Sequence, residues 1–172
     1  MIPEIEFTCN GEKHFLNSIT TEQYKRYIVL MEKNTSERSE DAIYFNERIV
    51  QELFGNKFSM GAIGEMDIIE FMTVSKTIHF IMQQIIGDKL LNMVAAEPVE
   101  KEESAFDEYD RENGYEEENQ EENQWKVCSE ILDRVVKIAI RLLNNSFSQC
   151  MKEDIVNLLD YLKYELDTVN EN

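Results

Sequence analysis

Histidine, cysteine and proline are scarce in this chain of 172 residues. Its two histidines and three cysteines include no CxxC or HExxH spacing, so the sequence offers no recognisable zinc motif. Cys9, Cys128 and Cys150 are an odd number of widely spaced thiols, which predicts reduced cysteines in a cytosolic protein. The six glycines stand singly, which excludes a glycine-rich phosphate loop.

Long apolar stretches are also missing. No run reaches the roughly 18 residues that a membrane-spanning helix needs. The opening MIPEIEF lacks the basic and then apolar stretch of a signal peptide. We therefore expect a cytoplasmic protein with no membrane partner.

Basic residues are half as numerous as acidic ones. The 35 acidic and 17 basic side chains give a net charge of −18, which repels nucleic acid and anionic lipid. Apolar residues make up 42% of the chain, close to the globular norm of about 45–50%. The composition thus predicts a folded protein that binds no nucleic acid and favours basic or apolar protein partners.

The first segment has the pattern of a β-hairpin. Ile5, Phe7 and Cys9 alternate with polar residues, as in a half-buried strand. Asn10-Gly11 follows, and both residue types tolerate the positive φ angles of a type I′ turn. A second strand over Glu12–Leu16 would return and pack on the helices that follow.

Three helices are expected between residues 20 and 96. Thr20 and Gln23 have the spacing of a capping box and begin a helix that ends near Asn34. Apolar positions at helical spacing predict a second helix over residues 43–54. A third, over residues 68–86, is apolar nearly all round, which predicts a central place in the core.

A charged segment divides the chain. Residues 97–124 hold 13 acidic and 2 basic side chains, and self-repulsion predicts an acidic flexible linker. Residues 125–172 then show two amphipathic helical patterns, a C-terminal helical hairpin. The predicted fold is mainly α, with an N-terminal β-hairpin packed on a three-helix domain (1–96), the acidic linker and the C-terminal hairpin.

Few residues suggest chemistry. His14 and His79 are interpreted as structural or surface histidines, and Cys128 and Cys150 as buried thiols beside apolar helical patterns. Clustered carboxylates can bind Mg²⁺ on a rigid scaffold, so a metal-dependent helical hydrolase competes with the interpretation as a solvated linker. The carboxylates concerned are Glu116, Glu117, Glu118, Glu121 and Glu122. We predict no catalytic, cofactor-binding or metal site, and no enzyme.

The C-terminal hairpin predicts a binding function instead. Two helices of about 48 residues bury their apolar faces against each other only in part. The remainder would be covered by residues 1–96, by a second copy of the chain or by a client. Leu158, Leu162 and Leu166 are the candidate protein-binding residues, and the alternative places these leucines in the core.

Three stretches carry a resemblance to a known family. They are FLNSITTEQYKRYIVLMEKN (residues 15–34), IVQELFGNKF (49–58) and IHFIMQQII (78–86). They resemble the tail assembly chaperones of long, non-contractile-tailed bacteriophages and related prophages. The acidic segment and C-terminal hairpin resemble the downstream part of that family.

The resemblance implies a function. Members bind the long helical tape measure protein, keep it soluble and help to recruit tail tube subunits. They act in the bacterial host cytoplasm and are absent from the mature virion. The sequence leaves self-association open. The charge of −18 also permits an alternative, an acidic DNA-mimic inhibitor of a nucleic-acid-binding protein.

Overall fold

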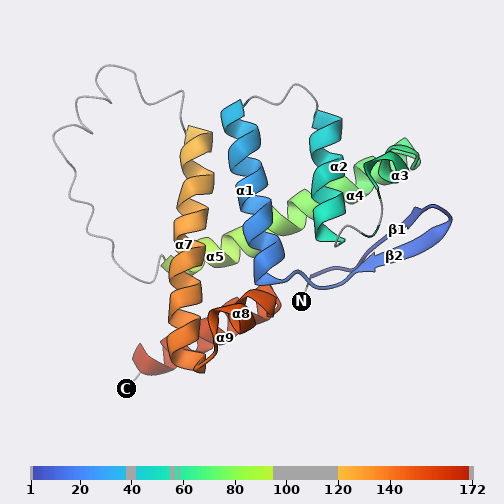
Figure 1. The fold of residues 1–172 in the computed structure, drawn as a ribbon. Helices are drawn as coiled ribbons and strands as arrows, with labels where there is room; N and C mark the ends of the chain where they lie inside the picture. Colours follow the sequence, from blue (N-terminus) through green and yellow to red (C-terminus); the bar gives the residue numbers. More distant parts are fainter. Residues whose placement is uncertain (1, 38–41, 55–56, 58, 95–119, 171–172) are drawn as a thin grey trace, which may run out of the picture.

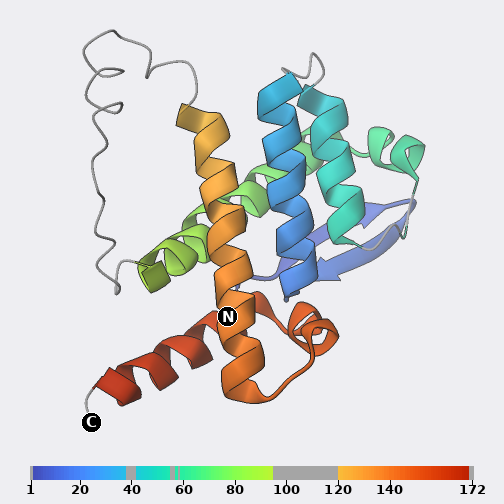
Figure 2. The same cartoon turned by 60° about the vertical axis from the view of Figure 1, so that its left-hand side comes forward.

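The computed structural model describes residues 2–37, 42–54, 57, 59–94 and 120–170. Helices dominate and a two-stranded antiparallel hairpin precedes them, which confirms the predicted fold class. Helices α1, α2 and α7 stand side by side, and α4 with α5 crosses behind them (Figures 1 and 2). The elements are β1 (Ile5–Cys9), β2 (Glu12–Leu16), α1 (Thr21–Glu37), α2 (Ala42–Leu53), α3 (Met60–Gly64), α4 (Ile68–Phe80), the π-helical η1 (Ile81–Gly87), α5 (Asp88–Val94), α7 (Gln120–Leu143), α8 (Phe147–Lys152) and α9 (Ile155–Asn170).

The N-terminal hairpin forms as its sequence predicts. Asn10 and Gly11 have φ angles of 55° and 75°, which the tight turn requires. The inward side chains of β1 are buried, and the Phe7 ring meets Phe54 edge to face at 4.7 Å. This contact anchors the hairpin to the end of α2.

The capping box at the start of α1 is also confirmed. Thr20 Oγ1 accepts from the Gln23 backbone N–H at 3.2 Å, and Gln23 Oε1 accepts from the Thr20 N–H at 2.8 Å. Gln23 Nε2 also donates to the Leu53 carbonyl at 2.6 Å, which ties α1 to the end of α2. The helix continues to Glu37, three residues beyond the expected end.

The long helix predicted over residues 68–86 does not end there. The chain continues from α4 through η1 into α5, and Gly87 is the last residue of the π-helical segment. A Cβ at Gly87 would lie 3.4 Å from the Met82 carbonyl oxygen and 3.7 Å from the Tyr24 hydroxyl. Both are ordinary van der Waals distances, so the packing of α1 against the π-helical turn leaves room for a Cβ at this position.

The central place in the core that was predicted for residues 68–86 does not hold for one face of α4. Phe71, Val74 and Ile78 are buried, but Ile69 and Phe80 are largely exposed. The covering elements reach only the inner face of α4, which packs on β1 and α2. The apolar pattern of the sequence cannot tell which face remains uncovered.

The C-terminal part contains three helices where two were expected. α7 begins at Gln120, so residues 120–124 of the predicted linker are helical, and residues 97–119 lie outside the described residues. Asn144, with a φ angle of 52°, ends α7. Ser146 then opens the short α8 with a capping box.

These C-terminal helices share one core with the N-terminal part. α7 packs along α1 and α5, and α9 packs on α5. The Thr21 N–H donates to the Glu153 carbonyl at 2.9 Å, and the Ile155 N–H donates to the Ile19 carbonyl at 2.9 Å. Lys25 also pairs with Asp133 at 2.6 Å. Residues 1–96 therefore cover part of the apolar surface of the C-terminal helices, which is one of the three possibilities considered above.

Candidate interaction surface

The three cysteines are buried and free. Burial raises the pKa of each thiol, and the carboxylates of Glu65 and Glu153 add to this at Cys9 and Cys150, respectively. A raised pKa lowers the thiolate fraction at neutral pH, and the thiolate is the reactive form. The arrangement therefore suits packing and provides no activated nucleophile at these positions.

His79 belongs to a partly buried polar network. Its Nε2 lies 2.8 Å from Asn46 Oδ1, which only accepts, so Nε2 carries the proton and Nδ1 accepts from the Tyr27 hydroxyl at 2.9 Å. Gln83 Nε2 donates to the same hydroxyl at 3.3 Å. Burial lowers the pKa of His79 and raises that of Tyr27, which favours the neutral form of both. The network joins α1, α2 and α4, a structural role.

Metal-ligating side chains do not gather anywhere in the described part of the chain. No group of three or more histidine, cysteine or acidic residues there is placed to hold an ion. Glu116, Glu117 and Glu118 lie outside the described residues, and Glu121 and Glu122 fall in α7 with their side chains outside the description. Among the described helices, none has the length and apolar character needed to cross a membrane.

An exposed apolar row on α4 is the first candidate interaction surface. Its members lie at helical spacing on the face that β1 and α2 leave uncovered: Ile68, Ile69, Met72 and Phe80, which we call the α4 row. Ile69 is 74% exposed and Phe80 is 54% exposed. Adjacent apolar side chains on one helix face are typical of a surface that contacts another protein.

The polar residues within the α4 row leave it largely apolar. Thr73 directs its hydroxyl to the Ile69 carbonyl at 2.7 Å, so its hydrogen-bonding need is met by its own helix. Lys76 lies between Met72 and Phe80 and has a long apolar stem. From Ile69 to Phe80 the row extends about 17 Å, which matches three turns of a partner helix.

The leucines that the sequence suggested for binding are placed differently. Leu158 and Leu162 lie in the core at 3% and 0% exposure, and Leu166 is half-buried. Leu158 and Leu162 are therefore not available at the surface. This agrees with the alternative, which placed the three leucines in the core. The packing of α9 on α5 accounts for their burial.

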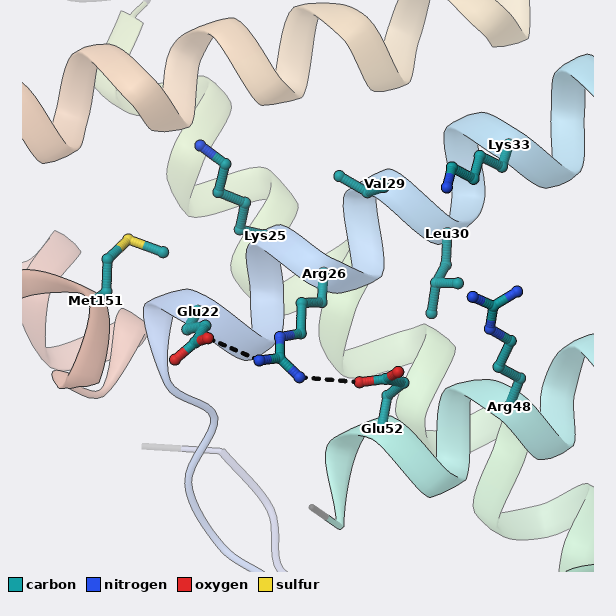
Figure 3. Close-up of a pocket in the computed structure, with 9 residues that line it drawn as sticks. All are labelled: Glu22, Lys25, Arg26, Val29, Leu30, Lys33, Arg48, Glu52 and Met151. Carbon is teal, nitrogen blue, oxygen red and sulfur yellow. Dashed lines mark hydrogen bonds and ion pairs between the residues drawn. The ribbon is translucent and has the colours of Figure 1, made fainter. Parts of the chain in front are cut away.

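A groove beside α1 is the second candidate interaction surface. It has a volume of about 470 Å³ and lies between α1, α2 and α8 (Figure 3). Val29, Leu30 and Met151 supply its apolar side chains. Its charged lining comprises Lys25, Arg26, Lys33, Arg48, Glu22 and Glu52, and we call the whole the α1 groove.

Sequence reasoning missed both surfaces. The sequence did not distinguish the α4 row, because its helix is apolar on nearly every side. The α1 groove brings together residues from three separate helices. The clustering of Lys25, Arg26 and Lys33 along one helix was the available signal for the groove. A comparison with protein families, curated proteins and solved structures finds no match for the chain.

Proposed function

We propose that this chain is a non-enzymatic binding protein of the phage tail assembly chaperone kind. Its client would be the long helical tape measure protein, which it keeps soluble in the bacterial host cytoplasm while tail tube subunits are recruited. It would then be absent from the finished particle. The observation that supports this best is the α4 row, four large apolar side chains exposed along one helix.

The chemistry of the α4 row suits such a client. An apolar stripe on a client helix gains free energy by leaving water, at roughly 25 cal/mol per Å² of area buried. Helices pack through side-chain ridges, and the row offers such a ridge about three turns long. Because the α4 row is already exposed, binding requires no unfolding of the protein.

The charge of the chain supports solubility of the complex. A net charge of −18 is retained when the apolar row is covered, so complexes repel one another. Masking of apolar area and electrostatic repulsion are the two properties that a solubilising chaperone needs. The resemblance of residues 15–34 and 78–86 to that family is the further support.

Co-expression with a fragment of the tape measure protein tests the proposal. The intact chain should move most of an otherwise insoluble fragment into the soluble fraction. The double variant Ile69→Ser/Phe80→Ser should lose most of this effect. Each lost apolar anchor costs about 1 kcal/mol or more of binding free energy, so affinity falls roughly tenfold or more.

The matched control removes two exposed rings elsewhere. Phe147→Ser/Tyr164→Ser changes residues of α8 and α9 that are 55% and 66% exposed. This control should solubilise the fragment as well as the unaltered chain does. If the fragment remains insoluble with the unaltered chain, or if both double variants act alike, the proposal loses its support.

A further inference from the structure

The outer edge of the N-terminal hairpin presents backbone groups that have no partner strand. The two-residue turn makes Cys9 and Glu12 the first hydrogen-bonded pair of the ladder, and such pairs alternate along antiparallel strands. The N–H and C=O groups of Lys13 and Phe15 therefore point away from β1. Among the described residues, neither main chain has a hydrogen-bond partner at this edge.

The opposite edge of the hairpin is covered. The Thr8 N–H points outward from β1 and donates to Glu70 Oε1 at 2.7 Å, and α4 packs on β1. The principal contacts of β2 are with β1 alone, and β2 lies along the outer side of the hairpin (Figure 1). An uncovered strand edge of this kind can accept a further strand.

The side chains of β2 add an aromatic ring to this edge. Lys13 and Phe15 alternate with the half-buried His14 and the buried Leu16, so both lie on the outer face of the sheet. Phe15 is 51% exposed. Lys13 already forms an ion pair with Glu6 on β1, so the edge offers backbone groups and a ring, and no free charge.

Two β2 edges are complementary to each other in one register. With His14 opposite the His14 of a second copy, each Lys13 exchanges two backbone hydrogen bonds with the Phe15 of the other copy. A shift of the pairing towards the turn would place Lys13 opposite Lys13, and like charges directly opposite are destabilising. A shift the other way would place Lys13 opposite Asn17, which lies beyond the end of β2.

We infer that β2 is the interface of a homodimer, in which two copies pair their β2 strands antiparallel about His14. The two hairpins then form one four-stranded sheet. Two-fold symmetry closes the pair, because each β2 edge is used once and the other edge of each hairpin is covered by α4. The interface shares no residue with the α4 row, so the inference stands whether or not the proposed chaperone function is correct.

The net charge of the chain determines how this dimer responds to salt. Each copy carries −18, so the copies repel each other, and salt screens that repulsion. One short strand pair is a small interface, and we expect a dissociation constant of about 0.1–1 mM near physiological ionic strength. The dimer should become about threefold tighter or more between roughly 0.05 and 0.5 M salt, whereas a contact held by opposite charges would weaken.

Sedimentation equilibrium of the intact chain at about 0.01–1 mM tests the inference. Lys13→Pro removes one outward N–H without affecting the hydrogen bonds to β1, and proline is tolerated on edge strands. This variant should weaken the dimer at least about tenfold. Lys13→Thr is the matched control, because it removes the same ion pair but keeps the N–H, and it should dimerise within about threefold of the unaltered chain. Urea midpoints from Trp125 fluorescence confirm that both variants are folded.

A cysteine in place of His14 reports the register. Residues opposite each other in a non-hydrogen-bonded pair have Cα atoms about 4.5 Å apart, within the range that a disulfide spans. Under mild oxidation His14→Cys should form a covalent dimer at least about tenfold faster than Thr8→Cys, whose exposed position on β1 lies away from the second copy. The chain's own three cysteines are buried.

Three results would overturn the inference. One is a chain that stays monomeric at about 1 mM in roughly 0.5 M salt. Another is a dimer that Lys13→Pro leaves as tight as Lys13→Thr does, which would assign dimerisation to a different surface. The third is an equal rate of covalent dimer formation by His14→Cys and Thr8→Cys.

Discussion

Leu132→Ala is expected to lower the free energy of unfolding by about 2–5 kcal/mol. Leu132 lies in α7 with no exposed surface, so truncation leaves a cavity within the shared core. A typical domain is stable by only about 5–15 kcal/mol, so this single change removes a large part of the total. The size of the effect depends on α7 being part of the same core as α1 and α5.

Urea unfolding followed by two probes measures both the loss and the sharing of the core. Trp125 is the one tryptophan of the chain, and its ring meets Tyr27 edge to face at 5.7 Å. Its fluorescence therefore reports the docking of α7 on α1, whereas circular dichroism reports all the helices. The two transitions should coincide in the unaltered protein and shift together in Leu132→Ala.

Leu142→Ala is the matched control on the same helix. Leu142 is 46% exposed, so its truncation should change stability by about 0.5 kcal/mol or less. A fluorescence transition that precedes the loss of helix would mean that α7 leaves α1 before the core unfolds. That result would contradict a single core.

Replacement of two neighbouring tyrosines by phenylalanine should change the free energy of unfolding in opposite directions. The Tyr27 hydroxyl donates to His79 and accepts from Gln83. Tyr27→Phe leaves both partners unpaired, and we expect a loss of about 1–3 kcal/mol. The Tyr24 hydroxyl is buried next to Gly87 and has no hydrogen-bond partner among the described residues.

Tyr24→Phe is therefore expected to stabilise the protein, by about 1 kcal/mol, because it removes an unsatisfied buried hydroxyl. Burial raises the pKa of Tyr24 strongly, which agrees with a neutral side chain in an apolar surrounding. Urea midpoints of the two single variants provide the comparison. If both variants lose stability to the same extent, the Tyr24 hydroxyl has a partner and the argument for it is wrong.

Local features of the fold could be read from the sequence. The Asn10-Gly11 turn and the Thr20 capping box depend on residues two or three positions apart, so short-range physics determines them. The end of α7 at Asn144 follows from a residue that tolerates a positive φ angle. Each of these signals is contained in a few consecutive residues of the sequence.

Features that depend on packing between distant segments could not be read in this way. Leu158 and Leu162 are buried in the packing of the C-terminal helices α7, α8 and α9, whereas the periodicity of the sequence marks them only as apolar. The same ambiguity made α4 seem central, although Ile69 and Phe80 face outward. An apolar pattern shows which residues can be buried, and the arrangement of neighbours decides which of them are.

The same distinction between local features and features that depend on packing applies to the candidate functional residues. Scarce histidine and dispersed cysteine predicted the absence of recognised catalytic motifs, and the structure then showed His79 engaged in a structural network. The α4 row and the α1 groove depend on which faces remain uncovered after packing. Their residues were visible in the sequence, but their exposure was not.

Hydroxyl-radical footprinting with and without a bound tape measure fragment tests the central claim most directly. Met72 and Phe80 are exposed on α4, and their oxidation should fall several-fold when the fragment is bound. Met82 is fully buried and should remain protected in both states, and Tyr164 on α9 should keep its rate. Unchanged oxidation of Met72 and Phe80 in a complex that has formed would contradict the assignment of the α4 row as the client surface.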